Sequence, residues 1–547
     1  MNRFSTVFYR STLQKIQRLK WQLSASQFVL AITVINLVLY HWPLYTFILS
    51  DLNFFSSNGF WTFFTVVLIA SLATVLAISL LTLVSFTLAK VFCGLVAIVN
   101  ALALYFMLTY QVILDKTMMS NVLNTQSTEA LAYLHPKMLV YVFVFGLLPA
   151  LLLFKVQIIK KSRLRLLIHN LTFLLIALVL IYLNSSSWLW LDKNSKILGS
   201  KIVPWSYLIN TIRIQNLHLD SLDEQHLLPS AHFSNDEKTV VVLVIGETAR
   251  AQNFSLYGYN RATNPLLSKR QDLTVLPNAT SCSTYTTASL RCILSHKDSP
   301  DSDEPLPSYL QRMGVDVTWR TRNWGEPPIH VAHYQKRQEL KKICQGIGCN
   351  YDEVLLSGLK QQILSSSKKK VFVVLHQKGS HGPSYYLEYP EQFEVFKPSC
   401  KSVELSQCSQ QELINAYDNT LLYTDHFLAR LIQLLEGLNN TSTVMLYLSD
   451  HGESLGEYGL YLHGTPYSIA PDVQKKIPFL VWMSKRFRDS RGLEKTLTHK
   501  KYEHSHHNVF HSIMGAFAMV GTIYNEERDI FHSPKNELNS LRDLEQP

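Results

Sequence analysis

Hydrophobic positions divide this chain into two parts. In the first part, five long runs are almost free of charge: Ser26–Leu49, Trp61–Val84, Val91–Leu114, Met138–Phe154 and Leu166–Leu183. A helix needs about 20 apolar residues to cross a bilayer, with a range of roughly 17 to 25. The pattern therefore predicts five transmembrane helices.

The apolar runs of the second part are shorter. Val240–Ile245, Val371–Leu375 and Val444–Leu448 are continuous and rich in β-branched residues, and amphipathic stretches such as Leu413–Leu435 lie between such runs. Continuous runs of this length are typical of strands buried on both faces of a parallel sheet. Because strands and helices alternate, we expect an α/β domain.

The change in composition along the chain suggests three segments. We expect a transmembrane domain over residues 1–187, an irregular interfacial linker over 188–237 and the α/β domain over 238–547. Trp188, Trp190 and Trp205 in the linker suit the headgroup region of a membrane.

Basic residues predict the orientation of the spans. They gather in the N-terminal tail and in the connection before the fifth span, whereas the other two sets of loops hold only Lys116 and Lys137. Positively charged loops stay in the cytoplasm. The N-terminus should therefore be cytoplasmic, and five crossings place the α/β domain outside. These basic segments explain much of the net charge of +10, so the charge does not indicate nucleic-acid binding.

The cysteines agree with this topology. Cys93 lies in a predicted span, and the other six form close pairs in the exported part: Cys282 with Cys292, Cys344 with Cys349, and Cys400 with Cys408. In an oxidising compartment, disulfides between neighbours are the natural expectation. Zinc–thiolate sites are the alternative, although the chain has no Cys-x-x-Cys motif.

Each of the three apolar strands is followed by a residue that could hold a metal or a phosphate. Glu247 follows the first strand, His376 the second, with His381 beyond it, and Asp450 with His451 the third. In open α/β sheets, ligands bind beyond the carboxyl ends of the strands. Two carboxylates and an imidazole suit zinc, and manganese less well, and leave a position for a catalytic oxygen.

The hydroxyl that could act as a nucleophile lies in a separate segment. Ser281–Ser289 is rich in Ser and Thr and opens a predicted helix over residues 288–294. Free N–H groups at a helix N-terminus favour a phosphate. Composition alone does not choose among these hydroxyls.

Several motifs together resemble one family. They are residues 246–248, Cys282 with Thr286 and Cys292, residues 379–383, residues 415–420, residues 449–457 and residues 461–464. The chain resembles, over nearly its whole length, the membrane-bound phosphoethanolamine transferases of Gram-negative bacteria, which include lipid A modifiers and the mobile colistin-resistance enzymes. The resemblance implies an alkaline-phosphatase- or sulfatase-like periplasmic domain behind five inner-membrane helices.

The resemblance also implies roles for individual residues. Thr286 would be the nucleophile, and the ligands of one zinc ion would be Glu247, Thr286, Asp450 and His451, with a second zinc left open. His381 and His463 would contact the transferred phosphate or hold the second zinc, and His376 and Asn323 would add contacts to the phosphate or the substrate. The donor headgroup would be bound by Asn121, Thr125 and Glu129, whose four-residue spacing places them on one face of a helix.

The implied reaction moves phosphoethanolamine from phosphatidylethanolamine to lipid A through a covalent Thr286 intermediate, in a monomeric protein, and confers polymyxin resistance. Transfer to a core sugar of lipopolysaccharide, phosphoglycerol transfer and a non-catalytic membrane sensor are the alternatives. The chain departs from the family at Trp324 and Pro327, which replace a hydroxyl and a cation, so its substrate pocket should differ.

Overall fold

The computed structural model describes residues 22–125, 130, 133–159, 163–184, 187–220, 225–298, 302–403, 405–493 and 503–532. The chain forms two compact units. One, the helical unit, comprises residues 1–120 and 134–216, and the other, the α/β unit, comprises residues 121–133 and 217–547. The division at residue 216 falls inside the predicted linker.

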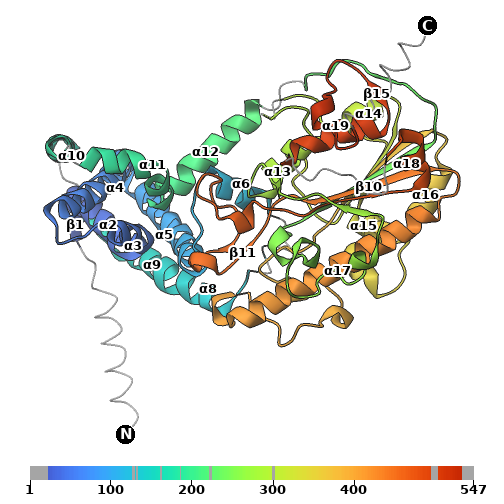
Figure 1. The fold of residues 1–547 in the computed structure, drawn as a ribbon. Coiled ribbons are helices and arrows are strands. Elements are labelled where there is room, and N and C mark those ends of the chain that lie inside the picture. Colours follow the sequence, from blue (N-terminus) through green and yellow to red (C-terminus); the bar gives the residue numbers. More distant parts are fainter. Residues whose placement is uncertain are drawn as a thin grey trace. The chain divides into compact units, whose positions relative to one another are not determined.

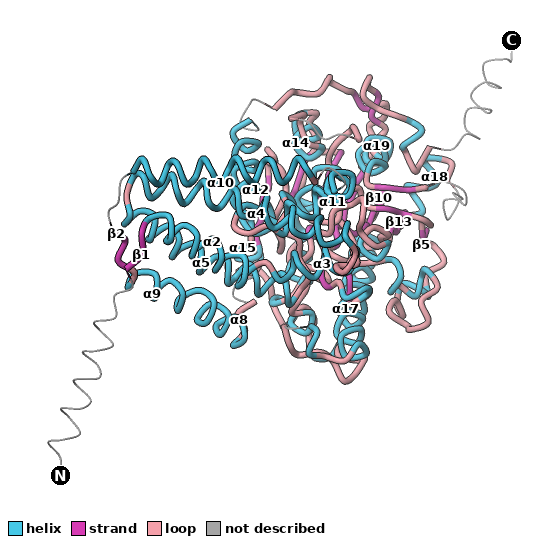
Figure 2. The backbone as a smooth tube through the Cα atoms, turned by 90° about the vertical axis from the view of Figure 1, so that its left-hand side faces the viewer, coloured by secondary structure: helices cyan, strands magenta, loops and turns pink. Residues whose placement is uncertain are grey.

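The helical unit is built from long apolar helices. Figure 2 shows them as coils beside the short strands β1 (Gln22–Ser24) and β2 (Gln157–Ile159). The helices are α2 (Ala25–Tyr40), α3 (Trp42–Asp51), α4 (Ser57–Val84), α5 (Phe86–Thr109), α8 (Pro136–Tyr141), a π-helical turn (Val142–Leu147), α9 (Leu148–Lys155) and α10 (Arg163–Leu183).

Four of the described helical segments are long and apolar enough to cross a membrane: Ser57–Val84, Phe86–Thr109, Pro136–Lys155 and Leu164–Leu183. The pair α2 and α3, bent by 63°, makes a fifth if it is one span. The bend lies at His41, where Pro43 follows at the start of α3 and cannot continue the helical hydrogen bonds. The prediction of a helical membrane domain is therefore confirmed.

The predicted linker is helical rather than irregular. It forms α11 (Trp188–Lys201) and α12 (Trp205–Asp220). The Trp190 indole donates to Asp51 Oδ2, and the Trp205 indole donates to Thr74 Oγ1 over 3.1 Å. Packing of these side chains against the spans overrides the weak helix preference of the local sequence.

The α/β unit contains a mixed sheet in the order β5-β13-β10-β4-β9-β7-β8. The strands are β4 (Thr239–Gly246), β5 (Leu273–Val275), β7 (Asp316–Thr321), β8 (His333–Lys336), β9 (Lys370–His376), β10 (Ser442–Ser449) and β13 (Phe479–Met483). β10, β4, β9, β7 and β8 are parallel, and β13 and β5 add an antiparallel edge. The three predicted strands are thus the adjacent centre of the sheet, and every residue of β4, β9 and β10 is buried.

Helices cover both faces of this sheet (Figure 1). The long α17 (Gln410–Glu436) runs along one face, and its first turn is closed by a capping box between Ser409 and Glu412. The other face packs α13 (Thr286–Ile293), α14 (Leu306–Arg312) and α19 (His507–Ala516) into one large apolar core. Smaller helices include α6 (Lys116–Asn124), α15 (Arg337–Leu340), α16 (Leu359–Ser365) and α18 (Lys485–Arg491).

The strand register brings the predicted ligands to one edge. Gly246 pairs with Ser449 across β4 and β10, and Ile245 pairs with His376 across β4 and β9. Glu247, His376 and Asp450 therefore stand at the same end of three neighbouring strands. The three neighbour disulfides are also present, Cys282–Cys292, Cys344–Cys349 and Cys400–Cys408.

Candidate active site

Two carboxylates meet beyond the ends of β4 and β10. The side chains of Glu247 and Asp450 are fully buried. Asp450 Oδ1 accepts hydrogen bonds from the backbone N–H of Thr248 at 3.0 Å and of His451 at 2.7 Å. Thr248 has a φ of 52°, and its carbonyl accepts from the Tyr417 hydroxyl of α17 at 2.7 Å. This turn directs the chain away from the sheet directly after Glu247.

Thr286 is brought to the carboxylates by α13, of which it is the first residue. Its Oγ1 lies 3.2 Å and 3.3 Å from the two carboxylate oxygens of Glu247, and 3.5 Å from His451 Nε2. The side chain is only 5% exposed. Among the hydroxyls of the 281–289 segment, Thr286 is the one found beside Glu247 and His451, whereas the hydroxyls of Ser281, Thr284 and Ser289 donate to backbone carbonyls.

His451 completes the cluster. Its Nδ1 lies 2.9 Å from the Gly452 carbonyl, which makes this nitrogen the donor and leaves Nε2 as the lone-pair nitrogen. Nε2 lies 3.2 Å from Asp450 Oδ2 and 3.5 Å from Glu247 Oε1. A neutral imidazole facing two carboxylates is the arrangement that a bound cation requires.

The buried site disfavours the charged forms of Glu247, Asp450 and His451. Burial, followed by the neighbouring Asp450, raises the pKa of Glu247 to about 8. Burial raises the pKa of Asp450 to about 6 and lowers the pKa of His451 to about 4. Such shifts in one buried cluster are common at functional sites, and a divalent ion would reverse them.

A second pair of side chains faces this cluster. His463 Nδ1 lies 3.1 Å from Glu453 Oε1, and the rings of His463 and His451 have centroids 4.4 Å apart. The His381 ring lies 5.4 Å from that of His463. Sequence reasoning gave Glu453 no role, although its position two residues after His451 was a usable signal. Burial raises the pKa of Glu453 to about 7.

The cluster fits a metal ion. Single ligand atoms of Glu247, His451 and His463 lie within 4.8 Å of one another, and Asp450 Oδ2 is buried with no hydrogen-bond donor among the described residues. Two carboxylates, two imidazoles and a hydroxyl are ligands that zinc accepts. His463 was predicted as a phosphate contact or a ligand of a second zinc, and its place in this group favours a role as a metal ligand.

A hollow of about 550 Å³ adjoins the cluster, with Asn323 and His381 in its lining. Asn323 Nδ2 donates to Glu247 Oε2 over 2.5 Å, so it orients the carboxylate. The wall carries the cationic side chains Arg322, Lys336, Arg337 and Lys378 against the carboxylates Glu326 and Glu388. Arg322 is paired with Asp352 and Glu388, which leaves the hollow a positive excess.

The remaining predicted residues lie further from the cluster. His376 is fully buried, with Nδ1 3.2 Å from Thr321 Oγ1 and its ring edge on Trp319, so its position gives no support to a substrate contact. Asn121 lies near Gly464, because a Cβ on that glycine would be 3.7 Å from Asn121 Nδ2.

The helical face predicted for Asn121, Thr125 and Glu129 lies only partly within the described residues. α6 ends at Asn124, and Thr125 hydrogen-bonds back to the Asn121 carbonyl over 2.7 Å. Glu129 lies outside the described residues. The four-residue spacing alone could not reveal where this helix ends.

Comparisons with known proteins identify the family. A sequence model described as phosphoethanolamine transferase EptA/EptB matches residues 71–219, and a sulfatase model matches residues 239–519. Phosphoethanolamine transferase EptA of Helicobacter pylori is 40% identical over 504 residues, which cover 90% of this chain and 94% of that protein. The chain belongs to the phosphoethanolamine transferase family.

Two further members extend the comparison. Phosphatidylethanolamine transferase Mcr-1 of Escherichia coli is 33% identical over 421 residues, which cover 72% of this chain and 78% of that protein. The solved structure of the integral membrane lipooligosaccharide phosphoethanolamine transferase A from Neisseria meningitidis has a TM-score of 0.84 and 27% identity, and covers 93% of this chain and 98% of that one. The predicted family and fold class are thus confirmed, and the protein is an integral membrane phosphoethanolamine transferase with a sulfatase-like domain.

Proposed function

We propose that the protein transfers phosphoethanolamine from phosphatidylethanolamine to lipid A, with Thr286 as the covalent carrier. The observation that carries this proposal is the position of Thr286 Oγ1, which is buried at the start of α13 and lies within 3.5 Å of both Glu247 and His451. A hydroxyl becomes a good nucleophile only beside a base or a metal. The names of the relatives support phosphatidylethanolamine as the donor and phosphoethanolamine as the transferred group.

Glu247, Asp450 and His451 would hold a zinc ion together with Thr286, and His463 is a fifth candidate. Bound zinc would lower the pKa of a coordinated hydroxyl and neutralise phosphoryl charge. The donor set on which this rests is buried and convergent.

The chain's own groups account for the remaining steps. Thr286 Oγ gives up its proton and forms a bond to phosphorus while the bond from phosphorus to the glycerol oxygen breaks, and that oxygen takes up the proton as diacylglycerol leaves. An acceptor oxygen then attacks the same phosphorus and releases Thr286. His381 and His463, whose ring centroids lie 5.4 Å apart, would donate hydrogen bonds to the phosphoryl oxygens, where charge accumulates. Glu453 keeps the His463 ring oriented.

The hollow beside Asn323 is the proposed binding site for the acceptor. Its cationic excess suits the phosphates of lipid A better than an uncharged core sugar. Pro327 stands where the family has a cation. Lys336 and Arg337, which come later in the sequence and line the hollow, would supply positive charge in its place.

The proposed topology places the N-terminus in the cytoplasm and the α/β unit in the periplasm. The basic N-terminal tail supports the first part, and three disulfides in the α/β unit suit the oxidising periplasm.

Mass spectrometry of lipid A and core oligosaccharide tests the proposal. Cells expressing the wild-type chain should gain phosphoethanolamine on lipid A, and cells expressing Thr286→Ala should not. Thr284→Ala is the matched control, since the Thr284 hydroxyl donates to the Thr465 carbonyl rather than facing Glu247. Phosphoethanolamine on the core with unmodified lipid A would show that the acceptor is a core sugar and not lipid A. Full transfer by a well-expressed Thr286→Ala protein would refute the covalent mechanism.

A further inference from the structure

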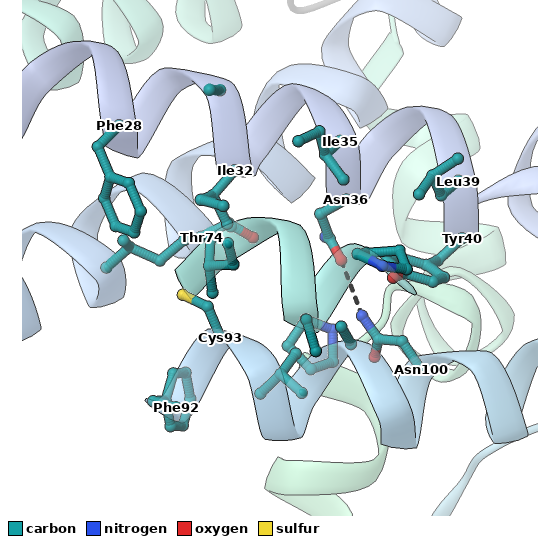
Figure 3. Close-up of a pocket in the computed structure, with 18 of the residues that line it drawn as sticks. Phe28, Ile32, Ile35, Asn36, Leu39, Tyr40, Thr74, Phe92, Cys93 and Asn100 are labelled. Atoms are coloured by element: carbon teal, nitrogen blue, oxygen red, sulfur yellow. Dashed lines mark hydrogen bonds between the residues drawn. The ribbon is translucent and has the colours of Figure 1, made fainter. Parts of the chain in front are cut away.

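A second hollow, of about 320 Å³, lies within the helical unit (Figure 3). Its walls come from α2, α4, α5 and α9, with Pro204 before α12 and Trp205, the first residue of α12. Small side chains leave the space open, because Ala31, Ala77, Ala97 and Ala150 stand where larger residues would fill it. Phe28 and Phe92 lie at one end, and Tyr40 and Asn100 at the other.

The lining is almost entirely apolar, and the polar side chains at one end are hydrogen-bonded within the protein. Asn100 Nδ2 donates to Asn36 Oδ1 over 2.9 Å, and the Tyr207 hydroxyl donates to Asn100 Oδ1 over 3.0 Å. Asn36 Nδ2 donates to the Val203 carbonyl over 3.1 Å. These side chains close one end of the hollow without requiring a polar ligand.

The hollow is continuous with the surface that faces lipid. Ile35 on α2 is 42% exposed, and Leu148 and Leu152 on α9 are 44% and 39% exposed, although all three line the hollow. An opening between two membrane-spanning helices, within the hydrocarbon region, meets lipid chains rather than water. An apolar hollow beside hydrocarbon gains dispersion contacts when a lipid chain enters it.

Its length matches one leaflet. Phe28 and Tyr40 are twelve positions apart on α2, which at 1.5 Å per residue is about 18 Å. Half of a hydrocarbon core of about 30 Å is roughly 15 Å. We infer that this hollow binds one acyl chain of a membrane phospholipid. The inference does not depend on the proposed reaction, because the residues concerned belong to the helical unit and not to the Thr286 cluster.

Photocrosslinking of the full-length protein tests this site. The protein is reconstituted into nanodiscs that contain phosphatidylethanolamine with a diazirine in one acyl chain, irradiated and digested, and the adducts are mapped by mass spectrometry. We expect adducts on lining residues such as Ile32 and Val96. Ala97→Phe fills the hollow and should lower their yield at least fivefold.

Leu95→Phe is the matched control, because Leu95 lies on the same helix, is 60% exposed and does not line the hollow. It should leave the adduct yield on lining residues unchanged. Ala77→Phe on α4 fills the same space if Ala97→Phe does not fold. Adducts confined to outward-facing residues of the wild type, or an equal yield in filled and control variants, would each overturn the inference.

Discussion

Gly379 controls the position of Glu247 through direct backbone contact. A Cβ at this position would lie 2.8 Å from the Glu247 carbonyl oxygen and 2.9 Å from its nitrogen. The glycine has a φ of 53°, and the next residue, Ser380, donates its N–H to the same Glu247 carbonyl over 2.9 Å. An alanine here must therefore displace the backbone that carries a proposed metal ligand.

The cost of Gly379→Ala has two parts. The left-handed conformation costs a residue with a Cβ about 1–2 kcal/mol, and relieving the contact costs about 1–3 kcal/mol more. Displacement of Glu247 should also weaken zinc binding about 10- to 100-fold, the usual effect of disturbing the support of a ligand. Gly314→Ala is the control, since Gly314 has a φ of 91° and nothing within 4 Å of its Cβ position.

Thermal unfolding and chelator competition on the detergent-solubilised full chain measure both effects. Gly314→Ala should lose only the conformational part of the stability and keep its zinc affinity. If Gly379→Ala matched Gly314→Ala in both measurements, the proposed support of Glu247 by this loop would be refuted.

Three other predictions concern separate parts of the α/β unit. Glu453→Gln removes the carboxylate beside His463 and should lower kcat about 10-fold or more with little change in KM, as steady-state kinetics can show; a change in KM alone would contradict this. Replacing Cys282 and Cys292 by Ala should lower the free energy of unfolding by about 2–4 kcal/mol in calorimetry, with a smaller further loss on adding reductant than in the wild type. Burial raises the pKa of Asp529 to about 7, so the folded protein binds this proton more tightly than the unfolded chain does. As the pH rises from about 4 to about 7, the free energy of unfolding should therefore fall, by at most about 1.4 kcal/mol per pH unit. Asp529→Asn should flatten this dependence in thermal unfolding curves, and an unchanged slope would contradict the assignment.

The centre of the fold was predictable because it depends on local patterns. Continuous β-branched runs over Val240–Ile245, Val371–Leu375 and Val444–Leu448 are typical of strands buried on both faces, and all three are neighbours in the sheet. The position of ligands at their carboxyl ends follows from parallel pairing. The long apolar runs likewise predict membrane helices directly from their length.

Other features depend on contacts that the local sequence does not contain. The pairing of Glu453 with His463 joins two loops, and no periodicity marks it. His376 is the last residue of β9 and Glu247 directly follows β4, yet the His376 ring packs inward on Trp319, because a position near a strand end does not fix the direction of a side chain. The helices of the 188–220 segment arise from packing against the spans, which the mixed polarity of the segment conceals.

The pairing of β4 with β10 has a consequence for assembly of the protein. Glu247 and Asp450 become neighbours only when Gly246 and Ser449 are in register, although about 200 residues separate them along the chain. The unfolded chain therefore contains no preformed metal site, and the free energy of metal binding at these side chains adds to the free energy of pairing the two strands. Metal starvation would then reduce the amount of folded transferase as well as the activity of each molecule, and a shift of the register by one residue would abolish both together.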